Sequence, residues 1–398
     1  MKNLYFRVGT SYYKRSLFPS LLKESIEILI NWSPELIRQD HGKTTLSDIE
    51  KFDGFICIPE HDPKLFKKRI EDYYNTYHQI SHIPIEGETT NSINFVDYIF
   101  GQQKEIGLDY LQLLYCKPTQ ILPILCLVSN LRNTGKSTFL KWLKNVFEYN
   151  TTFLTNSDFT SQFNSDWTDK LIVAVDEVLF RTDELTERIK YLSTTNSHKT
   201  EAKGRDKKES NFFGKFILCS NNETSFIKID KEEIRFWVLK IEQFEKEDVF
   251  FLDKLTKEIP AFLHFLSNRK LSTDNKSRMW FTPQEIRTSA LEKLVRFNSC
   301  KLEIEIANIL LNVIENLDIE KFDFSFTDLQ NILNKFKVKY DATEIKNIVR
   351  ENWKLEQARN SNQYQKISIT NDLDLYQNVG KGRYYSISKA FLLEKVMN

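Results

Sequence analysis

The sequence is poor in glycine, proline and cysteine, and its charges almost cancel. Its 398 residues include 11 Gly, 9 Pro and 5 Cys, and the 56 Lys and Arg exceed the 55 Asp and Glu by one. So little glycine and proline excludes collagen-like repeats and low-complexity linkers, which are enriched in both. A net charge of +1 excludes a uniformly basic surface, so any nucleic-acid role must depend on local basic patches.

A disulfide framework and a membrane span are not expected either. The cysteines are scattered, odd in number and mostly inside hydrophobic runs, which predicts reduced core residues; they are Cys57, Cys116, Cys126, Cys219 and Cys300. No hydrophobic run is long enough to cross a bilayer, and residues 1–7 lack the apolar region of a signal peptide. We therefore expect a cytoplasmic protein without a membrane partner. A hydrophobic content of 41% allows a large core in two or three domains.

The most informative segment is residues 125–138. A hydrophobic run with strand character (124–128) enters a polar loop that ends in Gly-Lys-Ser, and a helical pattern follows up to Phe147. This is the layout of a nucleotide phosphate cradle, in which backbone N–H groups and a helix N-terminus face the phosphates. Lys136 adds a positive charge, and the Ser137 hydroxyl can ligate Mg²⁺. The candidate ATP-binding residues are Asn133, Thr134, Gly135, Lys136, Ser137 and Thr138.

The phosphate-loop motif is incomplete at its first glycine. Asn130 stands at that position. Asparagine is the next-best residue at positive φ, so we expect Asn130 to adopt a glycine-like backbone. A Gly-Lys-Ser triplet alone is a weak signal, because it arises readily by chance. Its weight depends on the strands that follow.

Two further hydrophobic strands end in polar groups that suit an ATPase. Residues 171–175 predict a buried parallel strand that ends in Asp176 and Glu177. Asp176 would hold the Mg²⁺ shell together with Ser137, and Glu177 would polarise the attacking water. A third strand, 215–220, ends at Asn221, which places an amide where a γ-phosphate sensor belongs. The alternative is a degenerate fold that kept its strands and lost turnover.

A basic turn lies between the second and third of these strands. It spans residues 201–209 and carries Lys203, Arg205 and Lys207. A hairpin that projects cations from an ATPase ring would follow the phosphate backbone of single-stranded DNA. A solvated surface turn is the alternative.

The last third of the chain predicts a winged helix. Helical patterns cover 302–317, 326–336 and 342–353, with Ser325 or Thr327 as N-cap of the second. Two alternating strands, 366–369 and 383–388, follow and are joined through Gly380–Arg383. Three helices and a basic hairpin suit duplex DNA, with one helix in the groove and the wing on phosphates. A winged helix used for protein contacts is the alternative.

These motifs together resemble superfamily 3 helicases. Gly-Lys-Ser, Val-Asp-Glu, the basic turn and Leu-Cys-Ser-Asn-Asn occur here in that family's order. Over about residues 91–290 the chain is similar to the primase-helicase proteins of phages and mobile elements, which are related to the poxvirus-type helicase. The resemblance implies an AAA+-like core that assembles into a hexameric ring and translocates 3′ to 5′ on single-stranded DNA. It also implies a bacterial or phage-infected host cell.

The resemblance carries over to individual positions. Lys136 and Ser137 match the phosphate loop, Asp176 and Glu177 the Walker B acids, Lys203 and Arg205 the DNA loop, Asn221 the sensor amide, and Arg235 the arginine that acts on a neighbouring subunit. The chain departs from the family at Asn130 and by lacking the proline that is common after the sensor asparagine. No primase-type pattern of catalytic acids precedes residue 119, so primase activity is not expected.

The resulting fold class is α/β, with three expected regions. Residues 1–118 form an α+β and helical N-terminal region that would serve as an oligomerisation collar, 119–275 the AAA+-like P-loop NTPase core, and 280–398 the winged helix. The expected function is an ATP- and Mg²⁺-dependent replicative helicase acting on single-stranded and on forked or origin duplex DNA. Two alternatives are a nucleotide-switched defence or signalling ATPase without unwinding, and an origin-binding scaffold with a vestigial site.

One metal-like spacing occurs in the N-terminal region. Cys57, His61, His78 and His82 have a spacing that would allow a zinc site. Cys57 lies in a strand-like hydrophobic run, however, where a buried thiol is the usual interpretation.

Overall fold

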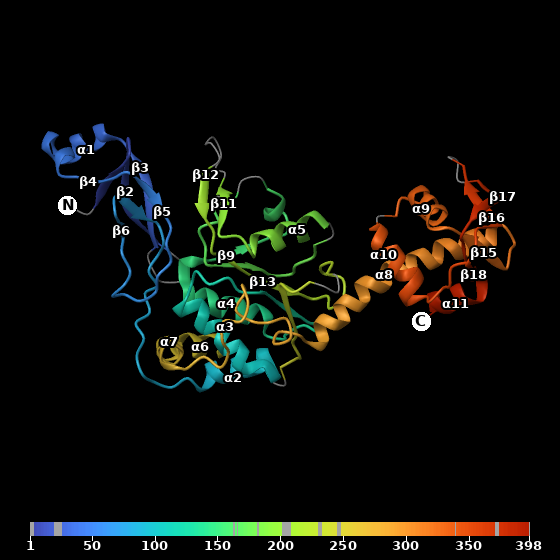
Figure 1. Ribbon diagram of the computed structural model, residues 1–398. Helices are drawn as coiled ribbons and strands as arrows, with labels where there is room; N and C mark the ends of the chain where they lie inside the picture. The colour runs from blue at the N-terminus through green and yellow to red at the C-terminus, as the bar shows by residue number, and fades with distance from the viewer. Residues whose placement is uncertain are drawn as a thin grey trace. The chain divides into compact units, whose positions relative to one another are not determined.

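The structure is a computed structural model (Figure 1). It describes residues 4–19, 26–161, 164, 166–180, 183–200, 208–229, 233–244, 248–338, 340–370 and 374–397. The chain divides into two compact units, Met1–Leu294 and Val295–Asn398, and each is described by itself. Within the described ranges, no helix is both long enough and apolar enough to cross a membrane.

The first unit begins with two small sheets. One has the strand order β3-β2-β1-β4 and the other β5-β7-β6. Their elements are β1 (Tyr5–Val8), β2 (Ser11–Phe18), β3 (Ile26–Trp32), helix α1 (Pro34–His41), β4 (Glu50–Phe52), β5 (Gly54–Ile56), β6 (Arg69–Ile70) and β7 (Tyr73–Asn75). The rings of Phe6 and Tyr74 stack with centroids 4.5 Å apart and join the two sheets in one aromatic core.

The segment between these sheets and the first long helix is bonded to the rest of the unit. His61 is buried, with its Nδ1 2.7 Å from the Tyr115 carbonyl oxygen and its Nε2 2.8 Å from the Tyr77 hydroxyl. His82 places Nε2 2.8 Å from the carbonyl oxygen of Asn145. Because these ring nitrogens have protein partners, the geometry does not support the zinc alternative at Cys57 and the three histidines.

A five-stranded sheet forms the centre of the first unit. Its strands are β8 (Ile124–Val128), β9 (Thr151–Leu154), β10 (Ile172–Val175), β13 (Lys215–Ser220) and β14 (Phe236–Lys240). They lie in the order β14-β8-β13-β10-β9 and every neighbouring pair is parallel. Burial on both faces explains the near-continuous hydrophobic runs in their sequences. Parallel pairing brings the carboxyl ends of β8, β10 and β13 to one edge of the sheet.

Helices and one hairpin accompany this sheet. They are α2 (Thr90–Phe100), α3 (Lys104–Cys116), α4 (Lys136–Phe147), α5 (Asp183–Leu192), the hairpin β11 (Ser197–Thr200) and β12 (Lys208–Asn211), α6 (Phe251–Lys257) and α7 (Ile259–Asn268). Pro260 lies in the first turn of α7, where its missing N–H costs nothing, and this explains the break between α6 and α7.

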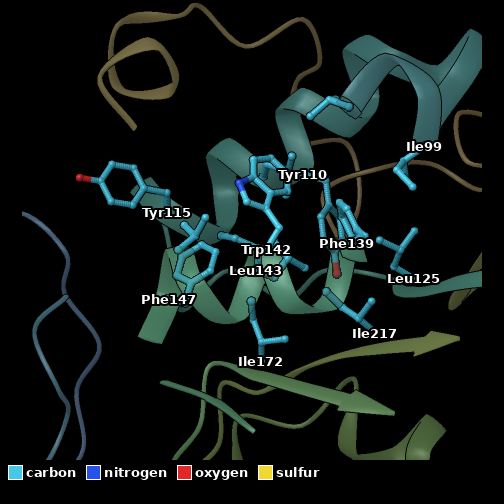
Figure 2. Close-up of a cluster of buried hydrophobic side chains, with 14 of the residues drawn as sticks. Ile99, Tyr110, Tyr115, Leu125, Phe139, Trp142, Leu143, Phe147, Ile172 and Ile217 are labelled. Carbon is cyan, nitrogen blue, oxygen red and sulfur yellow. The ribbon is translucent and has the colours of Figure 1, made fainter. Parts of the chain in front are cut away.

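Helix α4 is buried between the sheet and α3. Figure 2 shows Trp142 of α4 beside Tyr110 of α3, and Leu143 above Ile172 of the sheet. Trp142 and Phe139 are fully buried, and they belong to one hydrophobic cluster that also takes in α2, α3, α6 and α7. Replacing a buried aromatic residue by Ala costs about 3–5 kcal/mol, so this packing holds the start of α4 firmly against the edge of the sheet.

The second unit has its own hydrophobic core. Helix α8 (Ser289–Asn316) begins in the first unit and continues into the second. It is followed by β15 (Lys321–Phe324), α9 (Phe326–Lys335), α10 (Ala342–Asn347) with a π-helical turn (Ile348–Asn352), β16 (Asn362–Ile369), β17 (Leu375–Gly382), β18 (Tyr385–Ser388) and α11 (Lys389–Met397). Ser325 caps α9 in a capping box with Asp328, as the sequence predicts.

The expected pairing of the C-terminal hairpin is wrong. Strand β16 pairs over its whole length with β17, from Asn362↔Gly382 to Ile369↔Leu375, and β18 pairs with β15 instead. Residues Gly380 and Gly382 are therefore within a strand and not in the turn. A Cβ atom at Gly380 would lie 3.0 Å from the Tyr364 ring, so glycine is needed here because an aromatic side chain of the opposite strand covers the position.

Candidate nucleotide-binding site

The loop between β8 and α4 has the backbone of an anion cradle. Gly135 is the N-cap of α4 with φ +78°, and Asn133 also has positive φ, at +55°. No side chain caps this 12-residue helix, so its first backbone N–H groups have no capping acceptor. A helix N-terminus without a capping side chain fits a phosphate group, both through its N–H donors and through the helix dipole.

Aromatic rings support the loop from behind. A Cβ atom at Gly135 would lie 2.6 Å from Phe244 and 3.5 Å from Phe95. The rings of Tyr98 and Phe244 stack 4.2 Å apart. The Tyr98 hydroxyl donates to the carbonyl oxygen of Glu242 and lies 3.4 Å from the carbonyl oxygen of Thr134. Sequence reasoning missed this support, although the spacing of Phe95 and Tyr98 on a helix was a signal that both face the same neighbour.

Lys136 lies largely buried within the loop. Its Nζ donates to Thr134 Oγ1 at 2.9 Å and to the Leu131 carbonyl oxygen at 3.5 Å. Burial lowers the pKa of Lys136, and the nearby carboxylate of Asp176 is among the groups that oppose this shift. The ammonium group is thus held inside the curve of the loop.

Ser137 and Asp176 lie side by side. The Ser137 hydroxyl donates to Asp176 Oδ2 at 2.7 Å, although the two residues are 39 positions apart in sequence. Asp176 directly follows β10, and Ser137 is in the first turn of α4. A hydroxyl and a carboxylate at this spacing suit Mg²⁺, which commonly binds one or two protein oxygens together with substrate phosphates. The residues present therefore fit a Mg²⁺–nucleotide complex.

Glu177 and Asn221 meet at the same edge of the sheet. Asn221 Nδ2 donates to Glu177 Oε1 at 3.4 Å, and Asn156 Nδ2 donates to the Glu177 carbonyl oxygen at 3.4 Å. Glu177 has φ +60°, which an L-residue other than Gly adopts at a cost of about 1–3 kcal/mol. The left-handed backbone turns this side chain away from the direction of β10 and toward Asn221.

Arg235 is not part of this cluster. It immediately precedes β14, whose first residue Phe236 pairs with Ile124 and whose last residue Lys240 pairs with Val128 next to the loop. Five residues of strand separate the two ends by about 17 Å. Arg235 instead forms an ion pair with Glu233 at 2.8 Å, and Lys190 contacts the same carboxylate at 3.2 Å.

The predicted DNA-contacting residues cannot be placed. Lys203, Arg205 and Lys207 lie outside the described residues. The strands that flank them are described, and they pair as an antiparallel hairpin with Ser197 opposite Asn211 and Thr200 opposite Lys208.

Asn130 does not have the backbone expected of it. It is not among the residues with positive φ; that conformation occurs at Asn133. Asn130 instead exchanges two hydrogen bonds with Glu223: its N–H donates to Oε1 and its Oδ1 accepts from the Glu223 N–H, both at 3.3 Å. Glu223 is a contact of the loop that the sequence did not reveal, because it lies two residues past the sensor position without a motif of its own.

One family model matches the region of the site. A model of a family described as a family of unknown function, DUF5906, matches residues 127–235. This stretch runs from the end of β8 to Arg235 and contains the loop, Asp176, Glu177 and Asn221. No curated protein sequence matches the chain.

Solved structures share the fold over nearly the whole length. The apo structure of the NrS-1 C-terminal region (305–718) is 15% identical, with a TM-score of 0.59, and the match covers 96% of this chain and 95% of that one. A second apo structure of that region, its A form, gives 15% identity and a TM-score of 0.57 with the same coverage. A JCV helicase structure matches 62% of this chain with a TM-score of 0.31, which is too low to bear on the fold. The chain therefore has the fold of the NrS-1 C-terminal region.

Proposed function

We propose that this protein is an ATP-dependent DNA helicase of a phage or mobile element. In this proposal several copies, six by resemblance to superfamily 3 helicases, form a ring that hydrolyses Mg²⁺-ATP and moves 3′ to 5′ on single-stranded DNA. The observation that carries it is the Ser137–Asp176 contact of 2.7 Å beside the uncapped start of α4, with Glu177 and Asn221 at the same edge of the sheet. One such edge can bind phosphates, hold Mg²⁺ and orient a water molecule.

Each residue of the cluster has a distinct task. The N–H groups at the start of α4 and the Lys136 ammonium would bind the phosphates, and Ser137 with Asp176 would hold the metal ion. Bound Mg²⁺ supplies positive charge that stabilises the charge developing on the transferred phosphoryl group. The Glu177 carboxylate would accept a hydrogen bond from the attacking water and so polarise it. Asn221 would keep this carboxylate in its orientation.

Two features support DNA as the substrate. The basic turn with Lys203, Arg205 and Lys207 joins β11 to β12 and would contact a single strand. The second unit has the helix and strand content that a winged helix requires, and it would bind forked or origin duplex DNA. Lys346 on α10 is exposed and available for phosphates, whereas Arg350 donates from Nε to the Tyr385 hydroxyl at 3.0 Å and is partly committed to the fold.

Two substitutions test the ATPase part of the proposal. Lys136→Ala removes the charge on the phosphates and should abolish nucleotide binding. Glu177→Gln keeps the size of the side chain and should retain binding while turnover falls by about a hundredfold or more, since only activation of water is impaired. Binding of a fluorescent ATP analogue and steady-state phosphate release measure the two effects. Turnover of Glu177→Gln at the wild-type rate would show that the assignment of the base is wrong.

Unwinding of forked DNA tests the helicase part. The wild-type protein should separate a fork with a 3′ single-stranded tail and should fail on one with a 5′ tail, and Glu177→Gln should fail on both. ATP turnover without strand separation would favour a nucleotide-switched ATPase. Duplex binding without turnover would favour a scaffold with a vestigial site.

A further inference from the structure

The carboxylate of Glu223 connects three parts of the first unit. It lies two residues after Asn221, beyond the end of β13, and its residue is only 6% exposed. One oxygen, Oε1, accepts from the backbone N–H of Asn130 at 3.3 Å. The other, Oε2, accepts from Lys293 Nζ of α8 at 2.7 Å. Glu223 and Lys293 are outside the phosphate-binding and catalytic set described above, and Asn130 is the first position of the loop motif.

The bond to Asn130 acts where strand pairing stops. Strand β8 pairs with β13 up to Val128↔Ser220, and the Ser129 N–H still donates to the Ser220 carbonyl oxygen at 3.1 Å. Asn130 is the next residue, and its N–H would lack a ladder partner without Glu223. The second hydrogen bond runs from the Glu223 N–H to Asn130 Oδ1. The two bonds together form a hydrogen-bonded ring between the start of the loop and the residues that follow β13. This ring determines where the loop leaves the sheet.

Lys293 supplies a positive charge to the buried Glu223 carboxylate. Glu223 would otherwise be a buried anion beside a site that binds phosphates, which is unfavourable both for its own desolvation and for an incoming anion. Burial raises the pKa of Glu223, but the hydrogen bond from Lys293 leads a set of contacts that leave this pKa lower than usual. The side chain therefore stays ionised and paired. Lys293 itself is 57% exposed, so its main structural contact is this one carboxylate.

We propose that Glu223 is a positioning residue for the phosphate loop, acting through Asn130, and that Lys293 of α8 holds Glu223 in its orientation. This inference rests on the proposed nucleotide-binding function. It adds a link from the loop to α8, the helix that continues beyond Leu294 into the second unit. By thermodynamic linkage, a change at Lys293 that releases Glu223 must change nucleotide affinity, and nucleotide binding must equally favour the paired state of Lys293.

A double-mutant cycle in the full chain tests the proposal. Lys293→Met removes the cation and Glu223→Ala removes the carboxylate, and the Kd for a fluorescent ATP analogue with Mg²⁺ is measured for each and for the double variant. Lys293→Met should raise the Kd by about three- to tenfold, the size of the net contribution of one ordinary hydrogen bond, because Lys293 is more than half exposed and acts on the loop only through Glu223. It should raise KM more than it lowers kcat. In the Glu223→Ala background, the same substitution should have no further effect.

Two controls separate positioning from general damage. Lys293→Arg keeps the cation and should retain nearly wild-type affinity. Arg287→Met breaks an exposed ion pair at the start of α8, in which Arg287 Nε and Glu292 Oε1 are 2.7 Å apart. This variant should leave the Kd unchanged. Thermal unfolding of every variant shows whether a weaker Kd reflects loss of fold. Lys293→Met should stay folded at the assay temperature, although its melting temperature should fall because the buried Glu223 carboxylate loses its cation.

The outcomes distinguish this inference from the function on which it rests. If wild type and Lys136→Ala bind the analogue equally, the proposed nucleotide site is wrong and the inference fails with it. If wild type binds and Lys136→Ala does not, only the inference is at risk. It is then overturned by a Kd for Lys293→Met within twofold of wild type, or by an equal effect of Lys293→Met with and without Glu223.

Discussion

At the scale of single residues, three positive backbone angles lie at the carboxyl edge of the central sheet. Asn133, Gly135 and Glu177 have positive φ at the candidate nucleotide site, while the other residues with positive φ lie elsewhere in the described chain. Strained residues persist only where surrounding contacts hold them, so the loop needs contacts that keep its shape. The aromatic support behind Gly135 supplies such contacts, because Phe244 occupies the space that a side chain at Gly135 would need.

Gly135→Ala adds only one methyl group, but we expect it to lower nucleotide affinity strongly. The new methyl group would be 2.6 Å from Phe244, and alanine at φ +78° costs about 1–2 kcal/mol before any clash. We expect ATP-analogue affinity to fall by at least about tenfold. The double variant Gly135→Ala/Phe244→Ala should recover part of this loss, since only the backbone strain remains.

A matched glycine provides the control for this prediction. Gly101 also has positive φ, at +52°, but no atom lies within 4 Å of the position its Cβ would take. Gly101→Ala should lower the free energy of unfolding by about 1–3 kcal/mol and leave nucleotide affinity unchanged. Equal effects of the two substitutions on affinity would mean that the contact with Phe244 does not shape the loop.

The proximity of some candidate residues was predictable where chemistry restricts the choice of residue. Lys136, Ser137 and Asp176 were proposed because phosphate and Mg²⁺ accept few residue types; Ser137 and Asp176 do lie 2.7 Å apart, and their role in nucleotide binding stays a prediction. The backbone of Asn130 was mispredicted, since the sequence shows which residue replaces a glycine but not which position takes over its conformation. Glu223 was missed because its partners are 93 and 70 positions away.

At the scale of elements, buried parallel strands were the easiest part to predict. The runs ending at Val128, Val175 and Ser220 are buried throughout, and they are hydrophobic except for Lys215 and Ser220 at the two ends of the third, because both faces of the sheet are covered. The C-terminal hairpin was harder. Glycines at 380 and 382 suggested a turn, but there they make room for Tyr364 in the opposite strand. A glycine can mark a lack of space as well as a change of direction, and the pairing partner distinguishes the two.

The buried His61 should make the attachment of the N-terminal segment sensitive to acid. Burial lowers the pKa of His61 to about 4, from an ordinary value of 6.5. The neutral ring is favoured in the folded state, so its contribution to stability is complete above pH 6.5 and is lost as the pH falls toward 4. The loss is on the order of 3 kcal/mol. Urea unfolding followed between pH 7 and pH 4.5 measures it.

Removing the histidine isolates this contribution from other acid effects. His61→Asn keeps a donor near the Tyr115 carbonyl oxygen but cannot gain a proton in this range. Its stability should be lower than wild type at pH 7 and should decline less steeply below pH 6.5. His264→Asn, at a partly exposed histidine of α7, should decline in parallel with wild type. A slope for His61→Asn equal to wild type would mean that protonation of His61 is not coupled to folding.

The basic turn between β11 and β12 makes a prediction for DNA binding. Lys203→Ala/Arg205→Ala should weaken single-strand affinity and abolish DNA stimulation of ATP turnover, while basal turnover survives. Loss of two phosphate contacts should reduce the slope of log affinity against log salt by about 1.4. Lys64→Ala/Lys67→Ala, which makes the same charge change at exposed positions of the N-terminal segment, should leave the slope unchanged. If the turn variant binds single strands normally across the salt titration, the basic turn is an ordinary solvated loop.

At the scale of the whole molecule, Arg235 and the candidate site lie at opposite ends of the central sheet. The site's edge holds Lys136, Ser137, Asp176, Glu177 and Asn221, but Arg235 lies at the opposite end of the strands. About 17 Å of sheet is more than an arginine side chain can span, so Arg235 cannot reach the phosphates bound by its own chain. A cation that stabilises the transition state is usual in this chemistry. If Arg235 has that role, it must act on a neighbouring copy.

Mixing two inactive variants tests this arrangement. Arg235→Ala keeps an intact loop and Lys136→Ala keeps an intact Arg235, so an interface between the two contains one complete site. In an equimolar mixture at most about a quarter of the interfaces are of this kind, and turnover should recover to no more than that share. Arg235→Ala mixed with the double variant Arg235→Ala/Lys136→Ala forms no complete site and should stay inactive. If mass measurement shows mixed assemblies and the first mixture is as inactive as the second, Arg235 does not act across a subunit boundary, and its pairing with Glu233 is its whole role.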